Sequence, residues 1–389
     1  MTTSFFALGV SIPVMSLIVT SKGYPLHFLG LAMVVLSLTV MIFELPSGVF
    51  ADAKGRKPSF ILGTCFSLFG TLLLFGQHYG LICLGFGFSG LGRAYGSGSL
   101  DALYIEKGQQ NGAKLEDLVF SLDLVSGLGL SIGSLFGGFL LSLGVQGPHL
   151  THPVLLARLT LLSISLVLAS VGIKESPAGT DQKRTFWYQL KEFRHVLQDT
   201  PFLIYLSFSI LVQGMLLSSL ESYWQPFLKQ LLDDGSQLWI LGMVSALVFA
   251  VSLLGSFLGK LLLRLGNSVG LYSLTFCSLF CLQAVLSFQN SMTLFILIFC
   301  IIYLLIGLLS VVGMFILNKT AKDEVRTSLI SLSSFSLQSG GVLSNIIATF
   351  VLGIGGIALF WNVSALLGLI IVLMLTKPLL QRFPRTGSK

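Results

Sequence analysis

The chain has 389 residues, of which 54% are hydrophobic and only 10% are charged, and its formal net charge is +7. Soluble domains average roughly 25% charged residues. This composition leaves too few polar side chains to cover a water-soluble fold, so much of the surface must face lipid. It excludes soluble enzymes, nucleic-acid-binding proteins and secreted domains.

Cysteine, histidine and the N-terminus give no sign of a disulfide framework, a metal site or a leader peptide. The five cysteines all lie in apolar segments, as small helix-packing side chains do. His149 and His152 share a short loop, but two ligands without a third do not predict a metal site. The N-terminus lacks a basic region and an A-x-A-like site, so no cleavable signal is expected.

Apolar segments long enough to cross a bilayer recur along the chain. A transmembrane helix needs about 20 mostly apolar residues, and the sequence predicts twelve, of which the first is short. They lie near residues 4–20, 29–51, 59–76, 80–105, 118–142, 154–173, 201–221, 238–262, 270–289, 292–317, 327–352 and 356–376. The fold class is therefore an all-α membrane protein.

Basic residues are distributed unevenly between the two sides of these spans. With both termini placed in the cytoplasm, the outer loops hold Lys22 and Lys229, and Arg93 and Arg158 lie in or near helices. Cytoplasmic positions tend to carry the excess of Lys and Arg. Here they hold 19 of the 23: Lys54, Arg56, Lys57, Lys107, Lys114, Lys174, Lys183, Arg184, Lys191, Arg194, Lys260, Arg264, Lys319, Lys322, Arg326, Lys377, Arg382, Arg385 and Lys389.

The longest polar stretch divides the spans into two groups of six. The predicted domains are an N-terminal six-helix bundle at 1–173, a cytoplasmic linker at 174–200 and a C-terminal six-helix bundle at 201–389. In the linker, Phe186, Leu190, Phe193 and Leu197 have helical spacing, which predicts either an amphipathic helix on the membrane surface or a solvated connection. Two such bundles are typical of transporters that rock about a central site.

The stretch GVFADAKGRK follows the second span and contains Gly48, Asp52, Gly55, Arg56 and Lys57. Gly48 allows close approach of a neighbouring helix, and Gly55 allows a tight turn. A carboxylate at a helix C-terminus is disfavoured without a partner, which Arg56 and Lys57 can supply. The stretch resembles the G-x-x-x-D-x-x-G-R-K signature of the major facilitator superfamily, in the loop where that family carries it.

The resemblance implies a function for this charge cluster. In the family the cluster is a latch that holds the two halves closed on the cytoplasmic side. An acid at the end of the fourth helix usually pairs with the signature arginine, which implies that Glu106 meets Arg56. Simple positive-inside anchoring of the loop, and an exposed surface acid at Glu106, are the alternatives.

Three ionisable residues lie deep within predicted spans, where charge is costly and usually functional. Glu44 lies about 12 Å from Asp52 along one helix face, and Asp101 about 7–8 Å from Glu106, at about 1.5 Å per residue. Arg93 is expected two turns from Asp101, on nearly the same face. The stretches E-x-P-x-G at Glu44 and S-G-x-x-[DE]-A ending beyond Asp101 resemble a bacterial efflux-like subgroup, and Arg93 resembles a family arginine linked to proton transfer.

These residues suit proton coupling. Burial in a low-dielectric cavity raises the pKa of a carboxyl group towards neutrality, whereas a neighbouring guanidinium favours its charged form. A carboxylate that alternates between Arg93 and a cationic substrate would bind and release one proton per cycle. The alternative for Glu44, Arg93 and Asp101 is a permanent structural ion pair. No cofactor other than the proton is expected.

The fifth span carries a ridge of small residues. Gly129, Gly133, Gly137 and Gly138 have close-packing spacing. The ridge resembles the G-x-x-x-G-P-x-x-G-G motif of family antiporters, with Ser134 in place of the proline.

Three further charged residues are expected near the ends of spans. Asp123 should open the fifth helix, where its N-terminus favours an acid. Arg158 should snorkel towards the outer surface. Glu221 is either a solvated cap or a gate at the outer entrance.

The expected substrate cavity combines charge in the N-terminal half with polar residues of the C-terminal half, namely Gln213, Asn318, Gln338 and Asn345. The resemblance implies a monomeric, proton-coupled exporter of small amphipathic or cationic compounds in a bacterial cytoplasmic membrane, and not an enzyme. The alternatives are a proton-coupled importer of a nutrient or metabolite and a lipid or lysolipid translocator. The expected partners are a small-molecule substrate and the lipid bilayer, without nucleic acid or metal.

Overall fold

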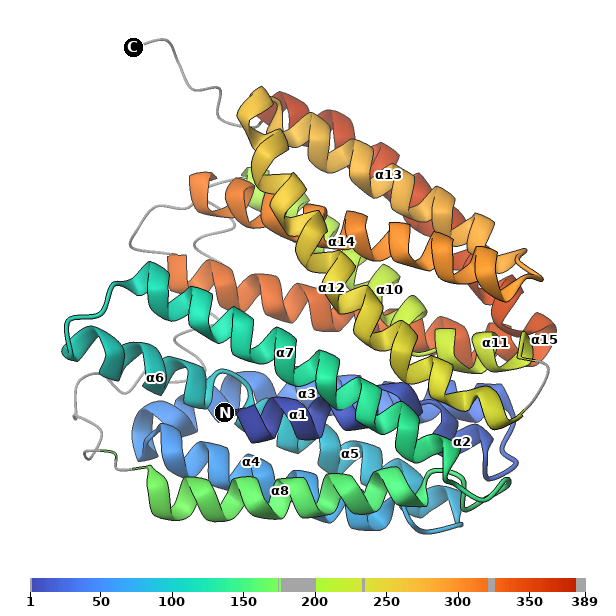
Figure 1. Cartoon of the computed structure of the whole chain (residues 1–389). Coiled ribbons are helices and arrows are strands. Elements are labelled where there is room, and N and C mark those ends of the chain that lie inside the picture. Colours follow the sequence, from blue (N-terminus) through green and yellow to red (C-terminus); the bar gives the residue numbers. More distant parts are fainter. Residues whose placement is uncertain (1, 174, 176–200, 233–234, 321–325, 383–389) are drawn as a thin grey trace. The chain divides into compact units, whose positions relative to one another are not determined.

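A computed structural model describes residues 2–173, 175, 201–232, 235–320 and 326–382 (Figure 1). The predicted amphipathic linker helix lies outside these residues. Throughout the described part of the chain the regular structure is helical, without strands. The first helices are α1 (Thr2–Ser11), η1 (Ile12–Val14), α2 (Leu17–Thr20), α3 (Leu26–Lys54), α4 (Arg56–Leu73), α5 (Tyr79–Gly96), α6 (Ser99–Gln110), α7 (Leu115–Ser142) and α8 (His152–Gly172).

The remaining helices follow the linker. They are α10 (Pro201–Glu221), α11 (Trp224–Gln230), η2 (Gly235–Leu238), α12 (Trp239–Leu262), η3 (Leu263–Leu265), α13 (Ser268–Ser287), α14 (Met292–Thr320) and α15 (Arg326–Arg382). The label α15 covers two successive helices, because the backbone is non-helical at Gly355 and Gly356.

The lengths and compositions of these helices confirm the predicted fold class. Within the described residues, eight helical stretches are long and apolar enough to cross a membrane, and one of them, Leu332–Gln381, contains the two helices of α15. The interrupted first helix, α4 and the α5–α6 pair supply the other expected spans. Large apolar side chains such as Phe139, Val171 and Ile354 are exposed, as lipid-facing residues are.

Two expected spans are interrupted. Pro13 lies in η1, which separates α1 from α2, because proline lacks the N–H that a continuous helix needs. The fourth span breaks between α5 and α6, where Ser97 is extended and Gly98 has a φ of +68°. The prediction of one continuous helix over residues 80–105 is therefore wrong.

The described helices form two compact units. The first contains α1 to α8 together with residues 225–247, and the second contains α10, the rest of α12 and α13 to α15. Residues 225–247 group with the first unit through contacts such as Gly138 with Gly242, and Ser16 Oγ with Gln225 Oε1 at 2.9 Å. The predicted division into bundles at 1–173 and 201–389 remains a prediction.

Small residues allow close helix packing inside each unit. In the first unit, a Cβ added to Gly90 of α5 would lie 2.8 Å from the Leu36 carbonyl oxygen of α3. In the second unit, Gly214 of α10 faces the Leu337 carbonyl of α15 with no room for a side chain. The second unit also buries a set of large aromatic residues that includes Phe295, Phe299 and Trp361.

Candidate functional site

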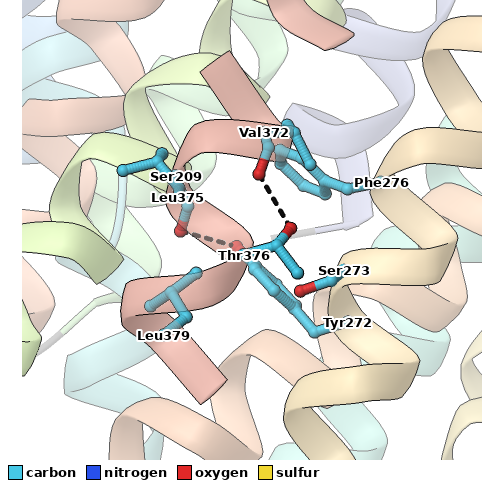
Figure 2. Close-up of a pocket in the computed structure, with 8 residues that line it drawn as sticks. All are labelled: Ser209, Tyr272, Ser273, Phe276, Val372, Leu375, Thr376 and Leu379. Atoms are coloured by element: carbon cyan, nitrogen blue, oxygen red, sulfur yellow. Dashed lines mark hydrogen bonds between the residues drawn. The ribbon is translucent and has the colours of Figure 1, made fainter. Parts of the chain in front are cut away.

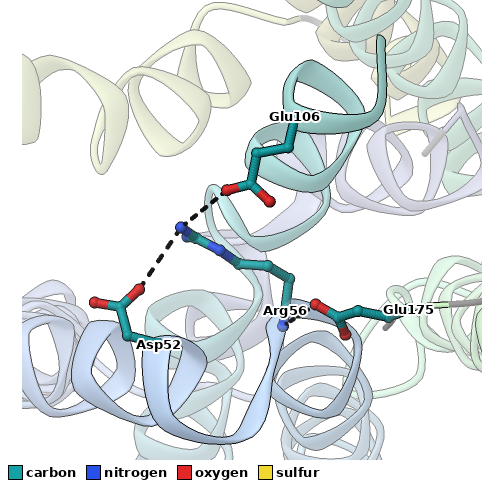
Figure 3. A network of polar contacts seen from close by, with 4 residues as sticks. All are labelled: Asp52, Arg56, Glu106 and Glu175. Atoms are coloured by element: carbon teal, nitrogen blue, oxygen red, sulfur yellow. Dashed lines mark hydrogen bonds and ion pairs between the residues drawn. The ribbon is translucent and has the colours of Figure 1, made fainter. Parts of the chain in front are cut away.

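The charge cluster at the start of α4 centres on Arg56 (Figure 3). Its Nη2 lies 3.6 Å from Asp52 Oδ1, one turn earlier, and 3.4 Å from Glu106 Oε1 of α6. All three side chains are substantially exposed, so the Coulomb energy of each pair is small. The structure therefore brings Asp52, Arg56 and Glu106 together, and their function as a latch remains a prediction.

A third carboxylate, that of Glu175, completes this cluster. One oxygen accepts a hydrogen bond from the backbone N–H of Arg56 at 2.7 Å (Figure 3). The other accepts from the backbone N–H of Lys57 at 2.8 Å. These are unsatisfied donors of the first turn of α4. Glu175 therefore caps α4 from the segment that follows α8, and its charge also suits the positive end of the helix.

Gly55 is required between Asp52 and this cap. Its φ of +105° is a region that residues with a side chain rarely adopt. A Cβ at this position would also lie 2.9 Å from Glu175 Oε2. Both the turn and the approach of the Glu175 carboxylate therefore favour glycine.

Lys57 and Gly48 behave differently from expectation. The Lys57 ammonium donates to the carbonyl oxygens of Ser170 and Ile173, both at 2.7 Å, so it caps the end of α8 and not the Asp52 carboxylate. A Cβ on Gly48 would meet no described atom within 4 Å. The close helix approach expected at Gly48 is thus not found among the described residues.

The three ionisable residues expected within the membrane lie on α3, α5 and α6. Glu44 and Asp101 are half-buried and Arg93 is exposed. The break at Gly98 separates the helix of Arg93 from that of Asp101, so the prediction that they share a face of one helix is wrong. No described side chain forms an ion pair with the Arg93 guanidinium.

Local packing nevertheless relates these residues. Ser47, one turn after Glu44, donates to the Ala94 carbonyl oxygen at 2.8 Å, which places the turn of Glu44 beside the turn of Arg93. Asp101 lies in the first turn of α6, where the helix N-terminus stabilises a carboxylate. Two acids and one guanidinium therefore occupy neighbouring helices of the first unit.

The glycine ridge of α7 packs on the first helix and on α12. Gly129 and Gly133 face Phe5 and Phe6 of α1, and Gly137 faces the Val10 carbonyl. A Cβ on Gly138 would lie 2.6 Å from the Cα of Gly242.

Ser134 lies within this ridge and is fully buried. Its hydroxyl donates to the Gly9 carbonyl oxygen at 3.3 Å.

The structure corrects two expectations for charged residues near helix ends. Asp123 is exposed, but α7 already begins at Leu115, so Asp123 lies two turns inside the helix and does not open it. Arg158 is only 6% exposed, so it does not snorkel to the surface. Glu221 is exposed at the last position of α10.

The four polar residues expected in the C-terminal half have different surroundings. Asn345 is buried, donates to Ser218 Oγ at 2.8 Å and accepts from the Tyr223 hydroxyl at 3.2 Å, so its amide is engaged inside the second unit. Asn318 donates to the Met314 carbonyl of its own helix. Gln213 and Gln338 are half-buried.

A small pocket lies elsewhere in the second unit (Figure 2). Tyr272 and Ser209 form a hydrogen bond of 3.1 Å at its wall. None of the four predicted cavity residues lines it, and it is too small to enclose a drug-sized ligand. Its walls are formed by Ser209, Tyr272, Ser273, Phe276, Val372, Leu375, Thr376 and Leu379.

Comparison with known proteins establishes the family. The sequence profile of the Major Facilitator Superfamily matches residues 1–344. The chain belongs to the major facilitator superfamily. It is also 26% identical over 226 residues to the uncharacterized MFS-type transporter YxaM of Bacillus subtilis (strain 168), a match that covers 58% of this chain and 56% of that protein. The chain thus matches little more than half the length of this relative.

Solved structures with the same fold include members of the superfamily. A mutant of the nucleoside transporter NupG has a TM-score of 0.80 at 12% identity and covers 98% of both chains. Another NupG structure has a TM-score of 0.74 at 14% identity, covering 99% of this chain and 97% of that one. An inward-facing bacterial homolog of the human lysosomal transporter Spinster has a TM-score of 0.69 at 13% identity, covering 99% and 96%. At these identities the likeness shows the fold alone.

Membership of the major facilitator superfamily identifies the chain as a multi-pass membrane protein of a transporter family. The sequence predicted Asp52 and Arg56 through the superfamily signature, and Glu106 through its position at the end of the fourth span. Sequence reasoning missed Glu175 and the bonds of Lys57 to α8. The available signal was an acid immediately after the sixth span, but a contact between segments so far apart in sequence has no local pattern.

Proposed function

We propose that this chain is a proton-coupled secondary transporter that exports small amphipathic or cationic compounds by alternating access. We place it in a bacterial cytoplasmic membrane, as a monomer with both termini in the cytoplasm, in keeping with the distribution of Lys and Arg. The observation that carries the proposal is the pairing of turns on α3 and α5, where Ser47 binds the Ala94 carbonyl between Glu44 and Arg93.

The proposed cycle uses this neighbourhood. Placing a carboxylate within a membrane span is energetically unfavourable, so such a residue usually has a function in transport. When Glu44 or Asp101 is ionised it attracts a cationic substrate, and protonation releases that substrate. Arg93 supplies a competing cation that keeps the acid from holding a proton or a substrate permanently.

The character of the second unit supports an amphipathic substrate over a sugar. Sugar recognition needs several polar side chains available to the ligand. In the second unit Asn345 is engaged with Ser218 and Tyr223, and Gln283 donates to Ser219 Oγ at 2.8 Å. These groups already use hydrogen bonds that a sugar would need.

Inside-out membrane vesicles that contain the protein test direction and substrate together. Acidification of the lumen should drive accumulation of the cationic dyes ethidium and Hoechst 33342, and collapse of the pH gradient should release them. Exchange of a labelled nutrient, with uridine as the first probe, in the absence of dye uptake would instead establish the importer. Movement of labelled lysolipid without dye uptake would establish the lipid translocator.

A further inference from the structure

Arg158 is a buried cation that the proposed transport mechanism does not use. It lies on α8, six residues after His152, about 9 Å along the helix axis. Its side chain is 6% exposed, and its Nη1 has no hydrogen-bond partner. No described residue forms a hydrogen bond or an ion pair with this guanidinium. A buried charge without a partner is strongly unfavourable, so something must compensate it.

The face of α8 that carries Arg158 is polar at heptad spacing. Thr151, Arg158 and Ser165 are seven residues apart, and all three are buried, at 0%, 6% and 3% exposure. Residues seven apart share one face of a helix. Ser165 Oγ lies 2.7 Å from Ser4 Oγ of α1, which shows that this face packs against the first helix.

The register of that contact places Arg158 beside the interruption of the first helix. Helices α1 and α8 meet at Ser4 and Ser165. Two turns from this contact, Ser11 lies towards the C-terminus of α1 and Arg158 lies towards the N-terminus of α8. Ser11 is the last residue of α1, directly before η1. Interrupted helices are where membrane transporters commonly hold ions, because the regular backbone pairing stops there.

The helices that pack most extensively on α8 offer no negative charge. The sequences of α1, α4 and α8 contain no aspartate or glutamate, and in α7, which also contacts α8, the acidic residues all lie within the first nine residues of the helix. In addition, Thr151 Oγ1 and His152 Nε2 are buried without partners at the start of α8. This part of the first unit therefore has unused hydrogen-bond donors and a cation, but no acid to pair with them.

We propose that Arg158 binds a small monovalent anion, either chloride or a carboxylate, between α8 and the interruption of the first helix at Ser11. A guanidinium has donors and no acceptor, so it selects an anion over a cation or a metal. Thr151 and His152 extend the polar face of α8 from Arg158 to the start of the helix. The bound anion neutralises Arg158 and fixes α8 against α1.

The test is the thermal stability of the purified full chain in detergent at constant ionic strength. Sodium isethionate, a bulky sulfonate that is neither a halide nor a carboxylate, is replaced stepwise by sodium chloride in one series and by sodium acetate in another. A small anion that binds the folded state should raise Tm once its concentration exceeds Kd, by roughly 2–4 °C at tenfold excess, and Tm should then continue to rise with the logarithm of the concentration. The series in which the rise begins at the lower concentration identifies the anion as a halide or a carboxylate.

Variants locate the effect. In Arg158→Gln the anion-dependent rise in Tm should be lost, whereas Arg264→Gln, which removes an exposed arginine of the second unit, should retain it. If Arg158→Gln does not fold, Arg158→Lys keeps the charge on a smaller donor group, and the rise should begin at a several-fold higher anion concentration. The proposal is overturned if neither anion raises Tm of the wild-type protein relative to the reference salt, because water alone then solvates the guanidinium. It is also overturned if Arg158→Gln or Arg158→Lys responds as the wild type does.

Discussion

At the scale of single residues, the Gly9 carbonyl shows how a side chain of one helix can replace a hydrogen bond that is missing in another helix. Residue 13 is proline and has no N–H, so the Gly9 carbonyl four residues earlier lacks its helical donor. The buried hydroxyl of Ser134 on α7 supplies a replacement at 3.3 Å. The residue that departs from the antiporter motif therefore has a structural function in this chain.

Replacement of this serine should measure how much the hydrogen bond from Ser134 to the Gly9 carbonyl contributes to stability. Ser134→Ala leaves the Gly9 carbonyl buried and unpaired, which costs about 1–2 kcal/mol. The expected result is a Tm lower by a few degrees in detergent. Ser142→Ala is the matched control, because Ser142 is exposed on the same helix and binds only its own Phe139 carbonyl. Equal Tm values for the two variants would contradict the assignment.

Lys22 is a second residue whose surroundings have a measurable consequence. In the loop between α2 and α3, its ammonium donates to the carbonyl oxygens of Leu74 (2.5 Å) and Gly76 (2.7 Å), just beyond α4. Burial lowers the pKa of Lys22 from 10.5 to about 8. Between these two pH values the unfolded chain binds more protons at this residue than the folded chain, so folding becomes more favourable as the pH rises.

The pH dependence of stability tests this effect. As the pH is raised from 8 towards 10.5, Tm of the wild-type protein should rise relative to Tm of Lys22→Met. The neutral amine retains two N–H donors, so the bonds to both carbonyls survive deprotonation. A difference in Tm between the two proteins that stays constant over this pH range would show that Lys22 is not perturbed by burial.

At the scale of elements, the break between α5 and α6 depends on one glycine. Gly98 has a φ of +68°, whereas Gly96, two residues earlier, is the last residue of α5. A Cβ would meet no described atom within 4 Å at either position, so only the backbone conformation distinguishes them. The two glycines therefore form a matched pair.

Alanine at each position tests whether the break is built into the backbone. Gly98→Ala should cost roughly 1–2 kcal/mol, because a side chain is disfavoured at positive φ. Gly96→Ala should be neutral or slightly stabilising, because alanine is the better helix former. The measurement is Tm of each variant, and Gly98→Ala should have the lower value. A Gly98→Ala variant with a higher Tm than the wild type would indicate that α5 and α6 form one continuous helix.

The start of α4 depends on a cap from outside the helix. The Glu175 carboxylate holds the backbone N–H groups of Arg56 and Lys57. Its removal in Glu175→Ala should increase hydrogen exchange at these two amides by roughly fivefold, since a cap contributes about 1 kcal/mol. Asp117→Ala, which removes an exposed acid from the first turn of α7, should leave exchange in α4 unchanged. Unchanged exchange in Glu175→Ala would show that the cap is not maintained in solution.

At the scale of the whole molecule, hydropathy and charge predict architecture well because both are set by the bilayer. Twelve spans follow from runs of apolar residues, and the signature cluster follows from residue types at fixed spacing. The interruptions at Gly98 and Pro13 are harder to predict from sequence, because many membrane helices tolerate a single glycine or proline without a break. The burial of Arg158 and the cap by Glu175 depend on which helices pack against each other. The spacing of residues along a single segment carries no information about that packing.

The central claim is that proton movement is coupled to substrate movement through Glu44 and Asp101. The most direct measurement uses proteoliposomes with a pH-sensitive dye in the lumen and ethidium as the transported probe. In the wild type, addition of ethidium should produce a proton flux in the direction opposite to ethidium movement. The control variant Asp123→Asn, which removes an exposed acid of α7, should show the same flux. Glu44→Gln and Asp101→Asn should abolish the flux. Undiminished ethidium-dependent proton flux in both of these variants would contradict the account.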